Sequence, residues 1–414
     1  MRRLMLAPAV DTHHPSHGGI LAWYWYLLVL VVAAAGTAAA VPLALRLAKR
    51  FNAIDYPDGR RVNKRPVPRL GGIALLAGLL LAILVLIILD ISLREALIAD
   101  SLNPSVCYPG VLLAVLAMFA VGVIDDLKGL RAHYKLIGQT IAAAIAVVAG
   151  VLFDHFANPF SGELIQLGWM AYPITIFYLV AFANIINLID GLDGLAAGIV
   201  AISATALFFV AVTRGGPDAA VVAVALVGAC LAFLFFNFYP ARVFMGDSGA
   251  LLLGFSLGIV SLFGVVRTPA LITLLVPVVI AGLPVIDTFA AIIRRRRNHK
   301  GALEADTQHM HHRFLDIGLD QRTTVLVMYS LSALLAICAF IVLQYSGPVR
   351  IVIVLILAVV VIFLVMRLRL FGPVLSHHYN KRIDDGKPSN IPDPTPARIL
   401  PDLPPDADID SSQL

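Results

Sequence analysis

Residues 70–89 read LGGIALLAGLLLAILVLIIL and contain no charged residue. The earlier stretch Leu27–Leu45 is also free of charge. A helix of about 20 residues crosses the roughly 30 Å hydrocarbon core of a bilayer, so each stretch is long enough to span a membrane. Strands of a membrane β-barrel would instead alternate in hydrophobicity over about 10 residues. The two stretches therefore predict membrane-spanning helices.

The composition of the whole chain agrees with this interpretation. Of 414 residues, 59% are hydrophobic and 14% are charged, and the mean hydropathy is +0.88. Soluble domains carry about 25% charged residues. We therefore exclude a soluble enzyme, a nucleic-acid-binding module and a disordered protein, and we expect membrane lipids around the chain. Three scattered cysteines indicate neither a disulfide framework nor a zinc site.

Apolar runs between polar breaks predict an all-α polytopic membrane protein with about eleven transmembrane helices. If the loop after the first helix is cytoplasmic, 24 of the 31 Lys and Arg lie in cytoplasmic loops and the C-terminal tail, and four lie in the opposite loops. Because cytoplasmic loops are enriched in Lys and Arg, we predict an outside N-terminus and a cytoplasmic C-terminus. The predicted helices lie near 21–47, 70–90, 108–124, 135–153, 171–189, 194–213, 218–238, 248–266, 269–293, 323–344 and 348–366.

The predicted membrane domain covers residues 20–370, between two flexible tails. Residues 1–19 show no apolar periodicity, and residues 371–414 are rich in Pro and Asp. Such a composition cannot bury a hydrophobic core. With the predicted topology, every polar cluster of the membrane domain falls on the cytoplasmic side.

The first polar cluster joins the first two helices and contains Asp55 and the sequence Pro-Arg-Leu-Gly-Gly at 68–72. A basic loop that fixes the topology is one interpretation. Anion binding by Arg69 and the backbone is the alternative, since paired glycines at a helix start allow close approach and leave N–H groups free.

The second cluster is Asp125 and Asp126 at the end of the third predicted helix, followed by Lys128, Arg131 and Lys135. Two carboxylates at a helix C-terminus oppose the helix dipole. A solvated helix end would tolerate them. Acidic pairs that face lysines also suit magnesium and phosphate chemistry.

The third cluster places Asn184, Asn187, Asp190 and Asp193 at every third position. Residues at this spacing stay within about 60° of one another around a helix, which predicts a polar stripe at the cytoplasmic end of the fifth helix. Charged residues inside a membrane are costly and normally serve a site. A glycine-capped helix turn is the structural alternative.

The fourth cluster is Phe-Met-Gly-Asp-Ser-Gly at 244–249, at the start of the eighth predicted helix. Its Asp247 is either a helix N-cap or a site residue. The fifth cluster follows four arginines at 294–297 and contains His309, His311, His312 and Arg313. Histidines can bind zinc, but imidazoles beside an arginine also suit a diphosphate or a sugar phosphate.

Taken in order, these clusters resemble the polyprenyl-phosphate N-acetylhexosamine-1-phosphate transferases, a superfamily that includes the phospho-N-acetylmuramoyl-pentapeptide translocase. The resemblance implies transfer of a sugar 1-phosphate from a UDP-N-acetylhexosamine to undecaprenyl phosphate, with release of UMP and with Mg²⁺ or Mn²⁺ as cofactor. It also implies the bacterial cytoplasmic (inner) membrane, the start of a lipid-linked cell-envelope glycan such as O-antigen or teichoic acid, and a homodimer as one assembly.

The resemblance also implies roles for individual residues. Asn187 and Asp247 match the metal ligands, and Asp125 and Asp126 match the pair assigned to catalysis. Substrate binding is implied for the remaining motif residues: Asp55, Arg69, Lys135, Asp190, Asp193, His309, His311, His312 and Arg313.

Several alternatives stay open at this level. The His-x-His-His-Arg sequence departs from the Pro-x-His-His-His-Phe-Glu pattern of the translocase, which favours UDP-GlcNAc over a UDP-MurNAc-pentapeptide donor; a UDP-N-acetylfucosamine-type donor is a further alternative. The lipid phosphate either attacks directly, which we favour, or a carboxylate forms a covalent intermediate. A secondary transporter is a distant alternative, since its site should lie near the bilayer midplane on broken helices.

Overall fold

The computed structural model describes residues 23–56, 66–93, 105–157, 164–214, 216–265 and 319–344, together with six single positions between 282 and 355. These residues all belong to one unit of the chain, within Met1–Gly372. The predicted tails 1–19 and 371–414 lie outside the described residues. So do almost all of the predicted helices 269–293 and 348–366.

The described part of the chain contains nine of the eleven predicted helices. Eight helical segments are long and apolar enough to cross a membrane by length and composition, and α4 is a shorter apolar helix. This confirms a helical, multi-pass membrane protein. The helices are α1 Trp23–Arg50, α2 Gly72–Leu93, α3 Tyr108–Lys128, α4 Ala132–Val148, α5 Ala171–Ile189, α6 Leu195–Thr213, α7 Pro217–Asn237, α8 Gly246–Val265 and α12 Gln321–Gln344.

Two short antiparallel ribbons join some of these helices. Strand β1 (Ile54–Asp55) pairs with β2 (Val67–Pro68), and β3 (His155–Ala157) pairs with β4 (Leu164–Gln166). A single 3-10 turn, η2 (Gly168–Met170), precedes α5. Strands of two or three residues are too short to produce an alternating pattern, so the sequence did not predict them. The first ribbon holds Asp55 next to the start of α2.

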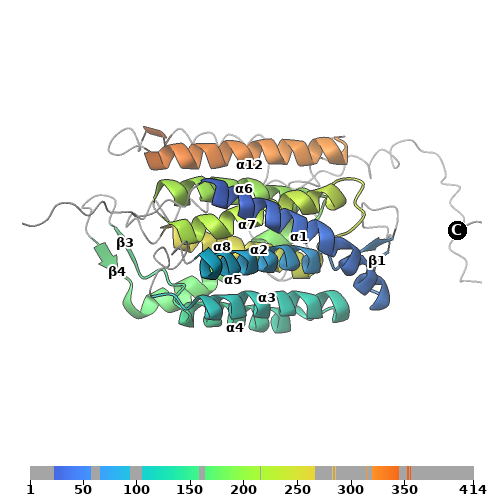
Figure 1. The fold of residues 1–414 in the computed structure, drawn as a ribbon, viewed down its shortest axis with the longest axis horizontal. Helices are drawn as coiled ribbons and strands as arrows, with labels where there is room; N and C mark the ends of the chain where they lie inside the picture. The colour runs from blue at the N-terminus through green and yellow to red at the C-terminus, as the bar shows by residue number, and fades with distance from the viewer. Residues whose placement is uncertain are drawn as a thin grey trace, which may run out of the picture. The chain divides into compact units, whose positions relative to one another are not determined.

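The helices lie side by side, with α12 and α3–α4 on opposite sides of the bundle (Figure 1). Helix α8 lies among the others and contacts α2, α3, α5, α6 and α7. Its side chains Leu251, Leu252, Leu253 and Phe255 are fully buried. A helix that is apolar all round belongs in the interior, and α8 has such a sequence. The most enclosed of the described helices therefore begins with the motif that contains Asp247.

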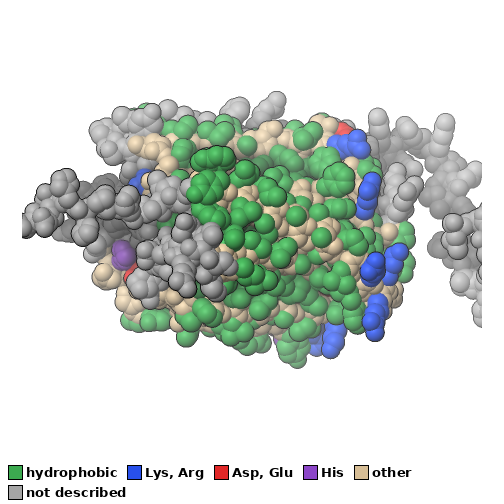
Figure 2. Space-filling view, in the orientation of Figure 1, with side chains coloured by type: hydrophobic (Ala, Val, Ile, Leu, Met, Phe, Trp, Pro, Cys, Tyr) green, Lys and Arg blue, Asp and Glu red, His purple; other side chains and the backbone are tan. Residues whose placement is uncertain are grey.

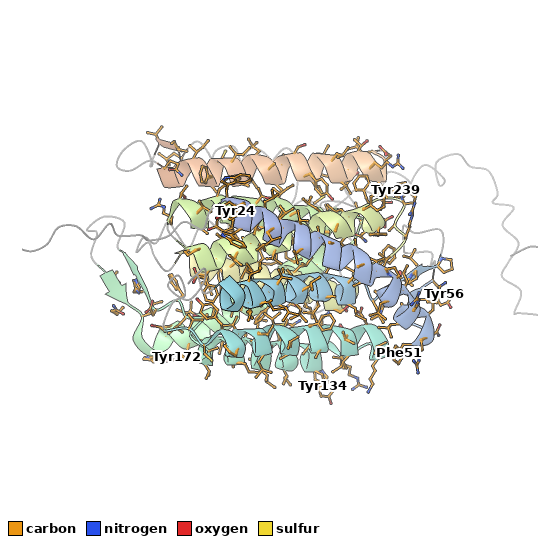
Figure 3. The ribbon with its side chains drawn as sticks, viewed as in Figure 1. Tyr24, Phe51, Tyr56, Tyr134, Tyr172 and Tyr239 are labelled. Carbon is orange, nitrogen blue, oxygen red and sulfur yellow. The ribbon has the colours of Figure 1, made fainter. Side chains whose placement is uncertain are left out.

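The surface has the pattern of a protein that sits in a bilayer. Hydrophobic side chains cover the middle of the visible face, and most visible Lys and Arg lie at the end where α1 stops (Figure 2). The exposed aromatic side chains of Phe51, Tyr56, Tyr134 and Tyr239 lie at this same end, and Tyr172 lies at the other (Figure 3). Aromatic residues are enriched at both membrane–water interfaces.

Candidate active site

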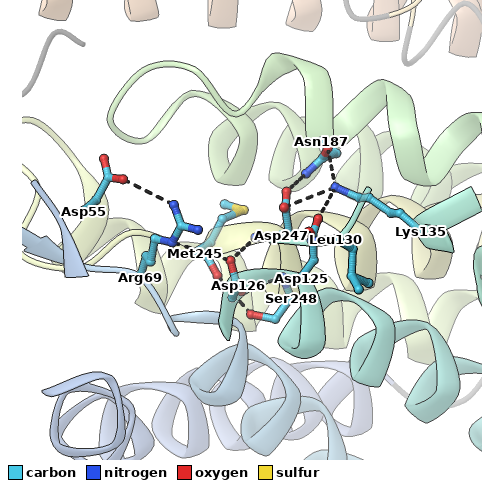
Figure 4. Close-up of polar contacts among 10 residues, drawn as sticks. All are labelled: Asp55, Arg69, Asp125, Asp126, Leu130, Lys135, Asn187, Met245, Asp247 and Ser248. Carbon is cyan, nitrogen blue, oxygen red and sulfur yellow. Dashed lines mark hydrogen bonds and ion pairs between the residues drawn. The ribbon is translucent and has the colours of Figure 1, made fainter. Parts of the chain in front are cut away.

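The ammonium group of Lys135 joins three oxygen atoms from three other helices (Figure 4). It lies 2.8 Å from Asp125 Oδ2 and 3.2 Å from Asp247 Oδ2. It also donates to Asn187 Oδ1 at 3.3 Å. The Asn187 amide donates in turn to the other carboxylate oxygen of Asp247. Four predicted site residues from α3, α4, α5 and α8 thus meet in one cluster, the Lys135 cluster.

Asp126 has a different environment from its neighbour Asp125. Its two oxygens accept hydrogen bonds from the backbone N–H groups of Asp247 (2.8 Å) and Ser248 (2.9 Å), and its side chain is 1% exposed. The first N–H groups of a helix lack partners within the helix and attract a negative charge. Asp126 therefore caps α8. The N-cap interpretation of Asp247 is wrong, because Asp247 lies inside the first turn and its side chain reaches Asn187 and Lys135.

Glycines allow the segments around this cap to approach one another. A Cβ on Gly122 of α3 would lie 2.4 Å from the Cα of Ser248, so any side chain there would separate α3 from α8. Gly246 has a φ of +68°, and its Cβ would lie 2.4 Å from the carbonyl oxygen of Arg69. A Cβ on Gly72 would lie 2.3 Å from the backbone nitrogen of Gly249. The close approach expected of the paired glycines is confirmed.

The free N–H groups expected at the same glycines are not present. Gly71 N–H donates to the carbonyl of Phe244 (2.9 Å), and Gly72 N–H donates to that of Met245 (3.0 Å). The Phe244 N–H returns a bond to the Pro68 carbonyl (2.8 Å). The anion-binding interpretation of this backbone is therefore wrong, because the segment preceding α8 occupies the donors.

Arg69 places a positive charge beside the site. Its Nη1 lies 3.3 Å from Asp55 Oδ1, and its Nε lies 4.0 Å from Asp126 Oδ1. Its side chain is 31% exposed, so Arg69 is partly open to solvent. The first ribbon places Asp55 beside it. The sequence predicted both residues for substrate binding, and the structure brings both to the edge of the Lys135 cluster.

Asp190 and Asp193 do not continue the helical stripe that their spacing predicted. Helix α5 ends at Ile189, and the turn after it passes through Gly194, whose φ is +81°. Asp193 Oδ2 accepts a hydrogen bond from the Ala241 N–H at 2.9 Å. Burial, together with three neighbouring carboxylates, raises the pKa of Asp190 to about 8. Burial also raises the pKa of Asp193, and its backbone hydrogen bond opposes the shift.

Two buried amide side chains near the site were not predicted from the sequence. Asn237, at the end of α7, accepts from the Gly194 N–H (3.1 Å) and donates to the Val243 carbonyl (2.8 Å). Gln139 of α4 pairs with Asn184 of α5. The available signals were the position of Asn237 at the end of a long apolar run and the position of Gln139 one turn after Lys135. His309, His311, His312 and Arg313 lie outside the described residues.

The oxygen atoms around Lys135 fit a hard divalent cation better than a soft one. Among the described residues, no group of three or more His, Cys, Asp or Glu side chains could hold a metal ion. Magnesium, however, usually takes one or two protein carboxylates and completes its shell with phosphates and water. Asp247 and the amide oxygen of Asn187, with Asp125 close by, provide such a partial oxygen site.

Known proteins are similar to this sequence over most of its length. The model for glycosyl transferase family 4 matches residues 108–265, which contain the whole Lys135 cluster. A probable undecaprenyl-phosphate N-acetylglucosaminyl 1-phosphate transferase of Bacillus subtilis is 35% identical over 300 residues, which cover 72% of this chain and 80% of the relative. The chain belongs to the polyprenyl-phosphate N-acetylhexosamine-1-phosphate transferases.

Further members of the family match over similar lengths. A decaprenyl-phosphate N-acetylglucosaminephosphotransferase of Mycolicibacterium smegmatis is 37% identical, over 68% of this chain and 73% of the relative. A phospho-N-acetylmuramoyl-pentapeptide-transferase of Desulforudis audaxviator is 36% identical, over 72% of this chain and 90% of the relative. Membership of this transferase family makes the protein an enzyme that transfers a phosphosugar.

Proposed function

We propose that this transferase moves N-acetylglucosamine 1-phosphate from UDP-GlcNAc to undecaprenyl phosphate and releases UMP. The observation that carries the proposal is the Lys135 cluster, where one cation meets three oxygens at the end of a membrane bundle. Two relatives that share more than a third of their aligned residues bear names of GlcNAc-phosphate transferases. Their names support GlcNAc as the sugar and a polyprenyl phosphate as the lipid acceptor.

The chemistry of the cluster suits a reaction between two anions. An oxygen of the lipid phosphate forms a bond to the β-phosphorus of the UDP-sugar, and the bond from this phosphorus to the bridging oxygen breaks, so UMP leaves with the electron pair. Positive charge must offset the repulsion between the phosphates. Lys135 supplies one such charge, and the exposed part of Arg69 supplies another. The lipid phosphate is itself an anionic nucleophile, so this route needs no covalent enzyme intermediate.

We assign distinct tasks to the carboxylates. Asp125 accepts from the Leu130 N–H (2.7 Å) and pairs with Lys135, so it orients the lysine and lies where it can receive a proton from an incoming phosphate. Asp126 supports the reaction through the start of α8. Asp190 and Asp193 border the site on the α5–α6 turn, where a nucleotide would lie.

Asn187 and Asp247 would hold a divalent cation, Mg²⁺ or Mn²⁺. Such an ion supplies charge neutralisation at the diphosphate when it is bound. The Asn187 amide and the Asp247 carboxylate already contact each other, so both are in place to act on one ion together. We assign recognition of the sugar to the segment that contains His309, His311, His312 and Arg313. This assignment rests on the sequence resemblance.

The location of the site in the bundle indicates how the protein is oriented in the membrane. Phe51, which follows the basic end of α1, and Tyr134, which precedes Lys135, lie at the same end of the bundle (Figure 3). Because basic ends favour the cytoplasm, we place the site at the cytoplasmic face of a bacterial inner membrane, where water-soluble UDP-sugars are available. A homodimer and a role in cell-envelope glycan synthesis remain predictions from the family.

A panel of donors tests the proposal directly. Purified protein with undecaprenyl phosphate and Mg²⁺ receives UDP-GlcNAc, UDP-N-acetylfucosamine or UDP-MurNAc-pentapeptide, and released UMP is measured. We expect UMP from UDP-GlcNAc, and we expect Lys135→Met to lower its rate by about 100-fold or more. Lys128→Met, at an exposed lysine beyond the cluster, is the matched control. Release from UDP-MurNAc-pentapeptide alone would assign the chain to its translocase relatives instead.

A further inference from the structure

One turn beyond Lys135 along α4, Gln139 forms a reciprocal amide pair with Asn184 of α5. Gln139 Nε2 donates to Asn184 Oδ1 (3.3 Å), and Asn184 Nδ2 donates to Gln139 Oε1 (2.6 Å). Asn184 Nδ2 also donates to the Val180 carbonyl of its own helix (2.8 Å). Gln139 is fully buried. Within the described residues, neither amide bonds to a member of the Lys135 cluster, so the effect of the pair on the site must pass through the helices.

The pair and the cluster form two rungs between antiparallel helices. Lys135 and Gln139 are four residues apart and share one face of α4, while Asn187 and Asn184 are three apart and share one face of α5. The first rung is the Lys135–Asn187 hydrogen bond, and the second is the amide pair. Two side-chain contacts on one face fix both the position of α4 along its axis and its rotation relative to α5.

Apart from the amide pair and the contacts of Lys135 with Asp125, Asp247 and Asn187, the described part of α4 has few directional contacts with other helices. Among the described elements it packs against α3 and α5. Its outer face presents Leu136, Ile137 and Ile141, which are 44%, 56% and 56% exposed. Apolar packing is non-directional and sets a register less sharply than hydrogen bonds do. A reciprocal amide pair in an apolar interface tolerates little displacement before both partners lose their bonds.

We propose that Gln139 and Asn184 are positioning residues that hold the ammonium group of Lys135 at the reacting phosphates. The proposal rests on the function proposed above. Lys135 sits in the first turn of α4, so a shift of this helix moves the ammonium group by the same amount. Misplacement of a catalytic group by about 1 Å can cost two orders of magnitude in rate. The amide pair therefore acts on turnover through Lys135 and does not contact the substrate.

Isosteric substitutions test the pair. Gln139→Met keeps the length and volume of the side chain and removes the amide, and Asn184→Leu does the same on α5. We expect each to lower kcat about tenfold or more while KM for UDP-GlcNAc stays within about threefold. The double variant should be no slower than the slower single variant, because each amide is useful only with its partner. Thr140→Val is the matched control, since Thr140 is exposed and, within the described part of the chain, its hydroxyl bonds only to the Leu136 carbonyl of its own helix.

Each alternative has its own outcome. A near-normal kcat for Gln139→Met overturns the positioning role, as does a double variant whose losses multiply. A drop in kcat that merely follows the folded fraction, measured by thermal unfolding in detergent, overturns it too. If Gln139→Met does not fold, Gln139→Asn keeps an amide but withdraws it by one methylene and serves the same comparison. Absence of UMP release by the unaltered protein would instead reject the proposed function.

Discussion

Asp126, near the end of α3, accepts a hydrogen bond from the backbone N–H of Asp247, in the first turn of α8, at 2.8 Å. One acidic residue thus secures the backbone of another while leaving its side chain available. The carboxylate of Asp126 therefore caps α8, while the carboxylate of Asp247 belongs to the Lys135 cluster.

Asp247→Asn tests the cluster. The variant keeps the shape of the side chain and removes its negative charge, so it should weaken both the pairing with Lys135 and the binding of a divalent cation. We expect turnover to fall by about 100-fold or more, since single electrostatic groups are commonly worth about 3–4 kcal/mol. A Mg²⁺ titration of UMP release measures the effect. Asp320→Asn is the control, because Asp320 is exposed and also lies at a helix start, that of α12. Near-normal turnover at low Mg²⁺ would contradict the metal assignment.

Gly122→Ala tests the contact between α3 and α8. The added methyl group meets the Cα of Ser248 at 2.4 Å, and a backbone neighbour cannot rotate away. Overpacking of this kind costs about 1–3 kcal/mol, and the shift of α3 also moves Asp125 and Asp126. We expect a lower unfolding temperature for Gly122→Ala. We also expect its activity to fall by more than its folded fraction does. Gly129→Asn is the control, since nothing lies within 4 Å of its Cβ and Asn tolerates its positive φ. Equal behaviour of the two variants would argue against tight packing at this seam.

Asp190 predicts a pH dependence of stability. Its pKa of about 8 in the folded protein lies above the ordinary value of 3.8, so the folded state holds the proton more tightly than the unfolded state. The associated stability is fully present below about pH 4 and is lost as the pH rises through 8. Asp190→Asn lacks this dependence. Thermal unfolding in detergent without divalent cations, between pH 5 and 9, should show the unaltered protein losing stability relative to the variant. Parallel curves would mean that Asp190 is ionised throughout.

Accessibility of single cysteines tests the orientation. In a background without native cysteines, Lys128→Cys lies at the end of the bundle that holds the site, and Trp169→Cys replaces a residue that is 76% exposed near the other end. We expect an impermeant thiol reagent to label position 169 in right-side-out vesicles. Position 128 should react only after the membrane is opened. The reverse pattern would move the site to the outer face.

Much of the fold was predictable because a bilayer imposes simple requirements. Charge-free runs such as residues 70–89 must be helical in hydrocarbon, where backbone groups have no water to bond. The meeting of Asp125, Lys135 and Asp247 followed from their places at helix ends. The capping role of Asp126 did not, since it depends on how α3 packs against α8. The hydrogen bond of the Gly71 N–H group could not be predicted either, because its partner Phe244 is far away in the sequence.

The bond between Asp126 and the start of α8 joins residues 121 positions apart in the chain. A ribosome adds about 5–20 residues per second, so roughly 6 to 24 s pass before α8 emerges after α3 has been made. During this interval α3 enters the membrane with its acidic end still lacking its final partner. A chain that stops before α8 therefore leaves the Asp126 carboxylate without the backbone N–H groups of Asp247 and Ser248.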